Sequence, residues 1–301
     1  MATIVYSDKY YCDIGFHVFP SKKYRLVYQM LEKHENLSDP RAHLIQPRVP
    51  TRDELLLVHT EKYLDDALNA RLTPATFSSE LPVKRDVIDA FLLSTGGTLV
   101  AAECATAQEP SINLGGGYHH AFADHAEGFC FFNDVAIATR KLLTEKKARR
   151  IAIVDCDLHQ GNGTAHIFLK EENVFTFSIH QEDNYPVKQE SDLDIGLDNG
   201  VGDQEYLEQL GRALDVIEKD FDPDFVFYLA GADPFEEDQL GALRLTHEGF
   251  RRRDDLVIGF SERKKIPICI VLAGGYSRDV RDTVRIHYQT CLRLFARGSK
   301  E

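Results

Sequence analysis

The sequence predicts an α/β protein with one domain, in which an open parallel sheet carries helices on both faces. From residue 112 onward, short apolar runs rich in valine, isoleucine and phenylalanine alternate with longer segments of helical periodicity. Strands that alternate with helices are joined by right-handed crossovers and lie parallel. Polar residues directly follow several of these runs, and the carboxyl ends of parallel strands meet at one sheet edge. Because no linker-like stretch or repeat interrupts the alternation, we expect a single domain over residues 1–301.

Strands are expected where short runs are mainly apolar, with many β-branched or aromatic residues, as in strands buried on both faces. These runs are residues 4–6, 112–114, 151–154, 174–179, 225–229 and 266–272. The segment 180–203 is predicted to be a long loop at the carboxyl end of a strand, where loops of this length are usually functional or mobile.

Helices are predicted from helical spacing of apolar residues and from capping side chains. The predicted helices are residues 21–35, 53–68 with Asp53 as cap, 86–105 with Asp86 as cap, 133–143, 164–170, 204–219, 247–260 and 279–296. The adjacent glycines Gly96 and Gly97 lie inside one of them, where glycine is less favourable than alanine. We therefore expect this helix to pack closely against a neighbour.

The composition argues against several classes of function. The net charge of -13, without a basic stripe, argues against nucleic-acid binding; it suits a cationic or lysine-bearing substrate and, equally, simple solubility. The six cysteines are scattered and include no Cys-x-x-Cys pair, which favours a reducing compartment over disulfides or a thiolate zinc site. Without a signal-peptide pattern or an apolar run judged long enough to span a bilayer, we expect a cytoplasmic protein, or also a nuclear one in a eukaryote.

Four predicted strands are followed by residues that can bind a metal ion or transfer a proton. The residues after them read GGGYHH from 115, DCDLH from 155, AGAD from 230 and AGGY from 273. If these ends share one sheet edge, the following side chains converge: His119, His120, Asp157, His159, Asp233 and Tyr276.

Asp157, His159 and Asp233 are candidate metal ligands. Side chains two apart on an extended strand point the same way, so Asp157 and His159 are expected to face one point. An Asp-x-His pair alone more often forms a hydrogen-bonded turn, but Asp233 adds a third ligand. Three ligands with a free fourth position are typical of catalytic zinc sites, although ferrous iron or cobalt also suits them.

The tandem histidines His119 and His120 are candidate proton carriers. An isolated histidine is more often a hydrogen-bonded core residue, but two beside a metal-activated water can divide the work of base and acid. Asp155 and Asn162 are within plausible reach of their outer nitrogens. An aspartate would hold its histidine more basic than an asparagine would, so the two imidazoles should differ.

Aromatic residues at the same edge have two interpretations. Tyr276 follows two glycines and either donates to an oxyanion or simply caps the sheet. Tyr118, Phe129 and Tyr185 either belong to the core or line a channel for a slim apolar stem.

Long motifs along nearly the whole chain resemble those of one family. They are IVYSDKY, GGGYHHA, GFCFFND, VDCDLHQGNG, FSIHQ, AGADPFEEDQLG and LAGGY. The sequence resembles the zinc-dependent histone deacetylases of the arginase-deacetylase fold and, within them, the class IV branch typified by histone deacetylase eleven. Most of the family has an aspartate at the position of Asn162, whereas class IV also has an asparagine there. The segment HVFPSKKYR lacks the His-Pro and the arginine that many relatives carry near the tunnel floor.

The resemblance implies a role for each candidate. Zn²⁺ would be held by Asp157, His159 and Asp233. His120 would be the general base and His119 would assist and protonate the leaving amine, with Asn162 and Asp155 orienting them, respectively. Tyr276 would bind the acyl oxygen. Phe129 and Tyr185 would be the facing walls of the tunnel, and Gly128 would offer its carbonyl to the substrate amide. Asp155, Ser178 and main-chain carbonyls would hold K⁺.

The resulting hypothesis is a zinc-dependent hydrolase that removes acetyl or longer fatty acyl groups from the Nε of lysine in proteins or peptides. Two alternatives remain open. The first is an amidohydrolase of small acetylated amines such as polyamines. The second is an inactive protein that binds acyl-lysine. The oligomeric state does not follow from the sequence.

Overall fold

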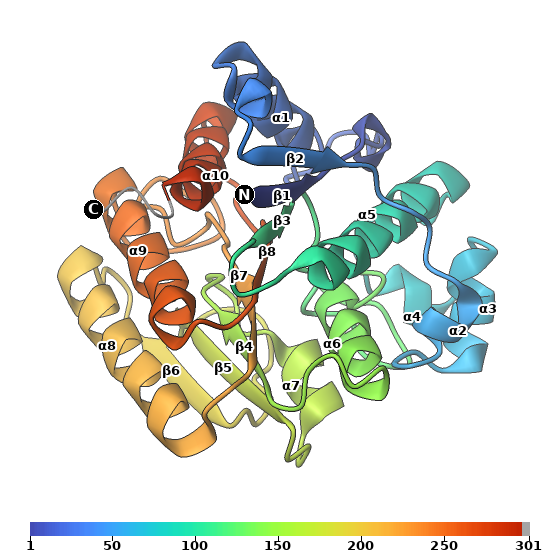
Figure 1. Cartoon of the computed structure of the whole chain (residues 1–301). Helices are drawn as coiled ribbons and strands as arrows, with labels where there is room; N and C mark the ends of the chain where they lie inside the picture. Colours follow the sequence, from blue (N-terminus) through green and yellow to red (C-terminus); the bar gives the residue numbers. More distant parts are fainter. Residues whose placement is uncertain (297–301) are drawn as a thin grey trace.

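The computed structural model describes residues 1–296, which form an eight-stranded, all-parallel sheet with helices on both faces (Figure 1). The strand order is β2-β1-β3-β8-β7-β4-β5-β6. The strands are β1 Ala2–Val5, β2 Ala42–Ile45, β3 Ser111–Asn113, β4 Ile151–Asp155, β5 Val174–Gln181, β6 Leu193–Leu197, β7 Phe225–Leu229 and β8 Ile268–Val271. The predicted parallel α/β sheet is confirmed.

The helices form two layers. On one side of the sheet α1, α10, α9 and α8 pack in series, and on the other side α5, α6 and α7 do so. The α-helices are α1 Lys23–Lys33, α2 Arg52–Leu55, α3 Glu61–Leu68, α4 Pro74–Phe77, α5 Arg85–Cys104, α6 Asp134–Thr144, α7 Asn162–Phe168, α8 Asp203–Val216, α9 His247–Lys264 and α10 Val280–Phe295. Buried side chains of both layers and of the sheet between them form one continuous apolar core.

Two strands lie in segments where none was expected. β6 lies within the predicted loop 180–203 and pairs with β5, and β2 pairs with β1. Both are edge strands with partly exposed side chains, such as Asp194 in β6 and His43 in β2. A partly exposed strand lacks the mainly apolar run by which the central strands were recognised.

The predicted helix 53–68 is two helices, α2 and α3, and its predicted cap is wrong. The hydroxyl of Thr51 accepts a hydrogen bond from the Glu54 amide, and the Glu54 carboxylate accepts one from the Thr51 amide. Thr60 caps α3. In α5 the N-cap position is occupied by Lys84, so Asp86 lies in the first turn instead of at the cap.

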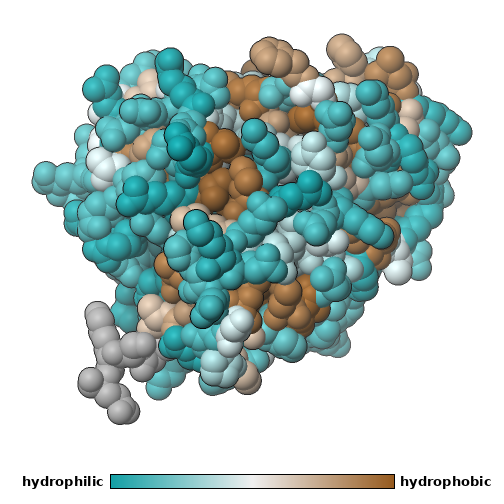
Figure 2. Space-filling view, turned by 90° about the horizontal axis from the view of Figure 1, so that it is seen from above, coloured by the Kyte–Doolittle hydropathy of each residue, from teal (hydrophilic) through white to brown (hydrophobic). Residues whose placement is uncertain are grey.

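The expected close packing of α5 is confirmed at both glycines. A Cβ at Gly96 would lie 1.6 Å from the Arg48 carbonyl oxygen, and one at Gly97 would lie 1.9 Å from the Tyr10 hydroxyl. By length and composition alone α5 could cross a membrane, contrary to our reading of the sequence, but 72% of its most apolar window is buried within the protein. The surface seen in Figure 2 is mainly hydrophilic, with separate apolar areas.

Candidate active site

The carboxyl ends of β3, β4, β7 and β8 surround a pocket of about 280 Å³. These four strands are adjacent in the sheet, so the loops that follow them meet at one edge. The lining includes His120, His159 and Tyr276 from the predicted group. His119, Asp157 and Asp233 lie beside them, almost completely buried. The expected convergence of the six side chains is therefore found.

Asp157, His159 and Asp233 bring one ligand atom each within 4.8 Å of one another. The reason differs from the strand alternation that we expected, because β4 ends at Asp155. The chain then turns, and the Asp157 carboxylate accepts a hydrogen bond of 3.0 Å from the His159 amide. A carboxylate that bonds the backbone two residues ahead stabilises such a turn. The hydrogen-bonded turn is therefore present, and the three side chains nevertheless converge.

The surroundings of these three residues fit a cation. Asp233 Oδ2 is completely buried and accepts no well-aligned hydrogen bond, although His159 Nδ1 lies 3.3 Å away, and a buried carboxylate costs free energy unless positive charge compensates it. A Cβ at Gly274 would lie 2.1 Å from this atom, and one at Gly231 would lie 2.6 Å from Asp157 Oδ2. Only glycine leaves room at both places. Two carboxylates and one imidazole are a donor set that Zn²⁺ accepts.

The charges of the three residues are strongly linked. Burial lowers the pKa of His159, but the carboxylates of Asp157 and Asp233 outweigh this effect and raise that pKa to about 10. Burial and the negative charge of Asp157 raise the pKa of Asp233 to about 6. Burial opposes ionisation of Asp157 too, yet His119 and His159 bring the pKa of this carboxyl well below its usual range. The pair of carboxylates thus attracts positive charge to this point.

The tandem histidines each have the outer partner that the sequence suggested. His119 Nδ1 lies 2.6 Å from Asp155 Oδ2, and His120 Nδ1 lies 2.7 Å from Asn162 Oδ1. The two Nε2 atoms lie 3.1 Å apart. Asp155 is the last residue of β4 and Asn162 the first of α7, so the strand and the helix that follows it hold both imidazoles.

The two partners give the imidazoles different proton affinities. Burial lowers the pKa of His119, but the charges of Asp155 and Asp157 dominate and raise that pKa to about 9. Burial also lowers the pKa of His120, and the positive charges of His119 and His159 bring it well below its usual value. These surroundings therefore favour a proton on His119 and disfavour one on His120.

The wall of the pocket includes a tight turn over Glu127–Cys130. The amide of Cys130 donates to the Glu127 carbonyl and the amide of Glu127 donates to the Cys130 carbonyl. Gly128 and Phe129 between them have φ values of 49° and 64°, as a type I′ turn requires. The Phe129 ring lies 5.8 Å from that of Tyr276, and the Gly128 carbonyl accepts from the Cys130 thiol.

Tyr185 forms the facing wall, with its ring 5.1 Å from that of His120. Tyr118 does not line this pocket. Its ring packs 4.8 Å from that of Phe91, and it borders an internal cavity of about 20 Å³ that shares His120, Phe129 and Tyr276 with the pocket. Tyr118 is therefore buried like a core residue and also borders the cavity beside the candidate site, so both interpretations of this side chain stay open.

Three further polar residues near the pocket were not singled out from the sequence. Lys23 is completely buried, donates to the Ala273 carbonyl at 2.6 Å and has its pKa lowered to about 8 by burial. Asp238 accepts a hydrogen bond from the Tyr276 amide at 2.7 Å, and burial raises its pKa to about 7. Glu127 contacts Asn162. Lys23 lies in HVFPSKKYR and Asp238 in AGADPFEEDQLG, both quoted above, but charged residues usually lie on the surface, so the sequence did not predict that these two are buried.

The proposed partners of a monovalent cation are neighbours. Asp155 and Ser178 are directly paired across β4 and β5. The Ser178 hydroxyl lies 2.9 Å from His180 Nδ1.

Comparison with known proteins identifies the family of this chain. The family model described as histone deacetylase domain matches residues 17–291. An uncharacterized protein of Picosynechococcus sp. is 40% identical over 287 residues, which cover 94% of this chain and 95% of that protein. Histone deacetylase 2 of Arabidopsis thaliana is 32% identical over 293 residues, which cover 92% of this chain and 75% of that protein.

The crystal structure of the HDA15 HD domain superposes with a TM-score of 0.81, covering 98% of this chain and 91% of that one at 24% identity. This likeness shows the expected arginase-deacetylase fold. The match over residues 17–291 and the Arabidopsis relative show the family. The chain belongs to the histone deacetylase family.

Proposed function

We propose that the protein is a zinc-dependent hydrolase that removes acyl groups from the Nε of lysine in proteins or peptides. The observation that carries the proposal is the buried group Asp157, His159 and Asp233. It lies beside two histidines, one with a raised pKa and one with a lowered pKa. A pocket lined by Phe129 and Tyr185 leads to it and suits the apolar stem of a lysine side chain. Membership of the histone deacetylase family supports the same reaction.

Zn²⁺ bound by Asp157, His159 and Asp233 would supply polarisation of the acyl carbonyl and acidification of the attacking water. The neutral His120 offers Nε2 as the base that takes the proton of this water. The Tyr276 hydroxyl donates a hydrogen bond to the carbonyl oxygen as its negative charge develops. The cationic His119 gives its Nε2 proton to the lysine nitrogen while the C–N bond breaks. A carboxylic acid and a free lysine amine are released.

Activity on acyl-lysine peptides and metal content test this proposal together. We expect zinc in the purified protein, loss of turnover with a chelator and recovery with added Zn²⁺. Tyr276→Phe should lower kcat by roughly 10²- to 10³-fold, the loss typical of removing one oxyanion donor. Tyr288→Phe is the matched control, because the Tyr288 hydroxyl bonds Asn36 outside the site. Near-normal turnover of the Tyr276 variant would contradict the mechanism.

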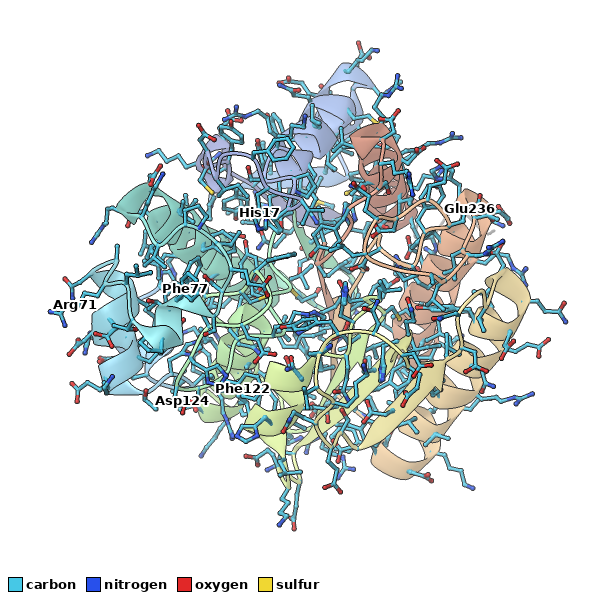
Figure 3. All side chains as sticks on the ribbon, turned by 180° about the vertical axis from the view of Figure 1, so that it is seen from behind. His17, Arg71, Phe77, Phe122, Asp124 and Glu236 are labelled. Atoms are coloured by element: carbon cyan, nitrogen blue, oxygen red, sulfur yellow. The ribbon has the colours of Figure 1, made fainter. Side chains whose placement is uncertain are left out.

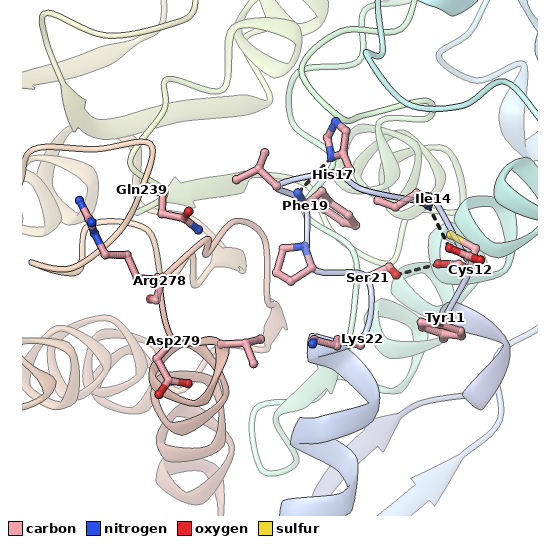
Figure 4. Close-up of a pocket in the computed structure, with 16 residues that line it drawn as sticks. Tyr11, Cys12, Ile14, His17, Phe19, Ser21, Lys22, Gln239, Arg278 and Asp279 are labelled. Carbon is pink, nitrogen blue, oxygen red and sulfur yellow. Dashed lines mark hydrogen bonds between the residues drawn. The ribbon is translucent and has the colours of Figure 1, made fainter.

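The size of the acyl group depends on the space beyond the pocket. The internal cavity next to Asp157 and Tyr276 has about 20 Å³, enough for one water or a methyl group. Phe19 borders both this cavity and an outer one of about 560 Å³, which Figure 4 shows. We propose that the Phe19 ring limits the acyl chain and that acetyl is preferred, whereas the class IV resemblance points to longer chains.

Rates on acetyl-lysine, myristoyl-lysine and acetylated polyamine substrates decide between these possibilities. Phe19→Ala and the milder Phe19→Leu should raise kcat/KM for myristoyl relative to acetyl, by roughly tenfold or more for the larger truncation. An unchanged ratio in both folded variants would exclude Phe19 as the limit. Negligible rates on every substrate would favour a protein that binds acyl-lysine without turnover.

Several finer expectations belong to this proposal. They are one catalytic domain over residues 1–301, membership of class IV, the roles given to Gly128 and Tyr118 at the substrate, a K⁺ ion near Asp155 and Ser178, and a cytoplasmic or nuclear location. The six unpaired cysteines support a reducing compartment.

A further inference from the structure

Glu127 lies directly behind the partner of His120. The Asn162 Nδ2 atom donates to Glu127 Oε1 at 2.7 Å, while Asn162 Oδ1 faces His120 Nδ1 at 2.7 Å. The same Oε1 atom accepts a hydrogen bond of 3.0 Å from the Tyr185 hydroxyl. The other carboxylate oxygen, Oε2, lies 3.5 Å from His125 Nε2. The four residues His120, Asn162, Glu127 and Tyr185 thus form one connected chain of polar contacts.

This chain removes an ambiguity that an asparagine alone would leave. The side-chain amide of Asn162 can turn either its oxygen or its nitrogen toward His120. A carboxylate only accepts hydrogen bonds, so Glu127 requires the NH₂ group of Asn162 on its side. The amide oxygen must then face His120, and Nδ1 of that ring must carry a proton. The neutral ring consequently keeps Nε2 unprotonated, as a base requires.

We infer that Glu127 is a positioning residue that fixes the tautomer of His120 through Asn162 and supplies the negative charge that Asp155 gives directly to His119. The inference rests on the proposed hydrolase function for its effect on turnover. It does not require that function for its effect on the imidazole. Asn162 with Glu127 behind it does in two residues what a single aspartate would do.

The backbone holds Glu127 in place for this task. Glu127 is the first residue of the type I′ turn that carries Gly128 and Phe129, and two backbone hydrogen bonds to Cys130 close this turn. Phe122 and Asp124, labelled in Figure 3, precede it in the same loop. Because Oε1 also accepts from Tyr185, one carboxylate joins the facing wall of the pocket to the partner of the base.

A double-mutant cycle on the zinc-loaded full chain tests the inference. Glu127→Gln keeps the shape of the side chain but can both donate and accept, so the Asn162 amide is free to turn. We expect kcat to fall roughly 10- to 100-fold, more than KM changes, as for other residues that orient a ligand or base. In the Asn162→Asp background two carboxylates would face each other, so the same change should raise kcat.

The reversal of sign separates positioning from a structural role. A Glu127 that only stabilised the loop would lower kcat by the same factor in both backgrounds, and that outcome would overturn the inference. An unaffected kcat in the Asn162 background would overturn it too. Glu248→Gln is the matched control, since it makes the same change in an exposed side chain that bonds Arg251 on α9. It should leave kcat unchanged.

A spectroscopic measurement tests the inference without turnover. In protein labelled with ¹⁵N-histidine, the ring resonances of His120 can be assigned by their loss in His120→Gln. We expect the Nδ1-protonated tautomer in the unmodified protein and a loss of its dominance in Glu127→Gln. An unchanged tautomer would refute the role of Glu127. If the unmodified protein hydrolyses no substrate, the proposed function fails, while this measurement still decides on Glu127.

Discussion

His119 and His120 are adjacent in the sequence and almost equally buried, yet they differ in their partners. His119 meets the carboxylate of Asp155, and His120 meets the amide of Asn162. The pKa of the first is raised to about 9 and the pKa of the second is lowered well below its usual value. The comparison shows that two partners, one at the end of β4 and one at the start of α7, can shift the pKa values of two adjacent histidines in opposite directions.

The two histidines also differ in how far each lies from the nearest carboxylate of its chain of hydrogen bonds. Asp155 places a negative charge directly against its imidazole, whereas the carboxylate on the side of His120 stands one residue further away, at Glu127. A direct carboxylate favours a cation, and an amide favours a neutral ring. In the proposed mechanism the cation is the acid and the neutral ring is the base.

The largest expected effect comes from removing either imidazole. His120→Gln should lower kcat by roughly 10²- to 10⁴-fold and remove the acidic limb of the kcat/KM profile, because the base is lost. His119→Gln should instead remove the alkaline limb. Measurement of kcat/KM from pH 5 to pH 10 distinguishes the two. If both variants lose the same limb, the assignment of opposite roles is wrong.

An intermediate effect is expected when the two partners are made alike. Asp155→Asn removes the charge that keeps His119 cationic, so the pKa of this ring should fall and the alkaline limb should move to lower pH. We expect kcat to fall roughly 10- to 100-fold. Asp222→Asn, the same change on the surface beside Lys264, should have no such effect. An alkaline limb that stays in place would show that Asp155 does not set the acid.

The smallest expected effect is on stability in metal-free protein. The folded state raises the pKa of His119, so this residue stabilises the fold fully below about pH 6.5, and that contribution is lost as pH rises to about 9. The pKa of His120 is lowered, so its contribution is lost as pH falls below about 6.5. Thermal unfolding against pH should show His119→Gln flattening the alkaline loss and His120→Gln the acidic loss. The opposite assignment would contradict the comparison.

The sequence by itself identified the central strands to within two residues and the reactive groups at their ends. Strands buried on both faces are mainly apolar, and parallel strands joined by helices must bring their carboxyl ends to one edge. The edge strands β2 and β6 escaped notice because half-exposed strands resemble loops in composition. The break between α2 and α3 escaped because the caps Thr51 and Thr60 compete with Asp53 for the same local pattern.

Only the tertiary structure decided which atoms meet. The sequence named Asp155 and Asn162 as candidate partners, but the distances of 2.6 and 2.7 Å assign each to its own histidine. No pattern in the sequence connects Glu127 with Asn162, which lies 35 positions further along the chain. A local pattern records which face of an element is buried, whereas contacts between loops depend on how distant segments are brought together. The sequence therefore identifies the reactive groups of this site, whereas the fold decides which partner each histidine contacts and which ring nitrogen carries a proton.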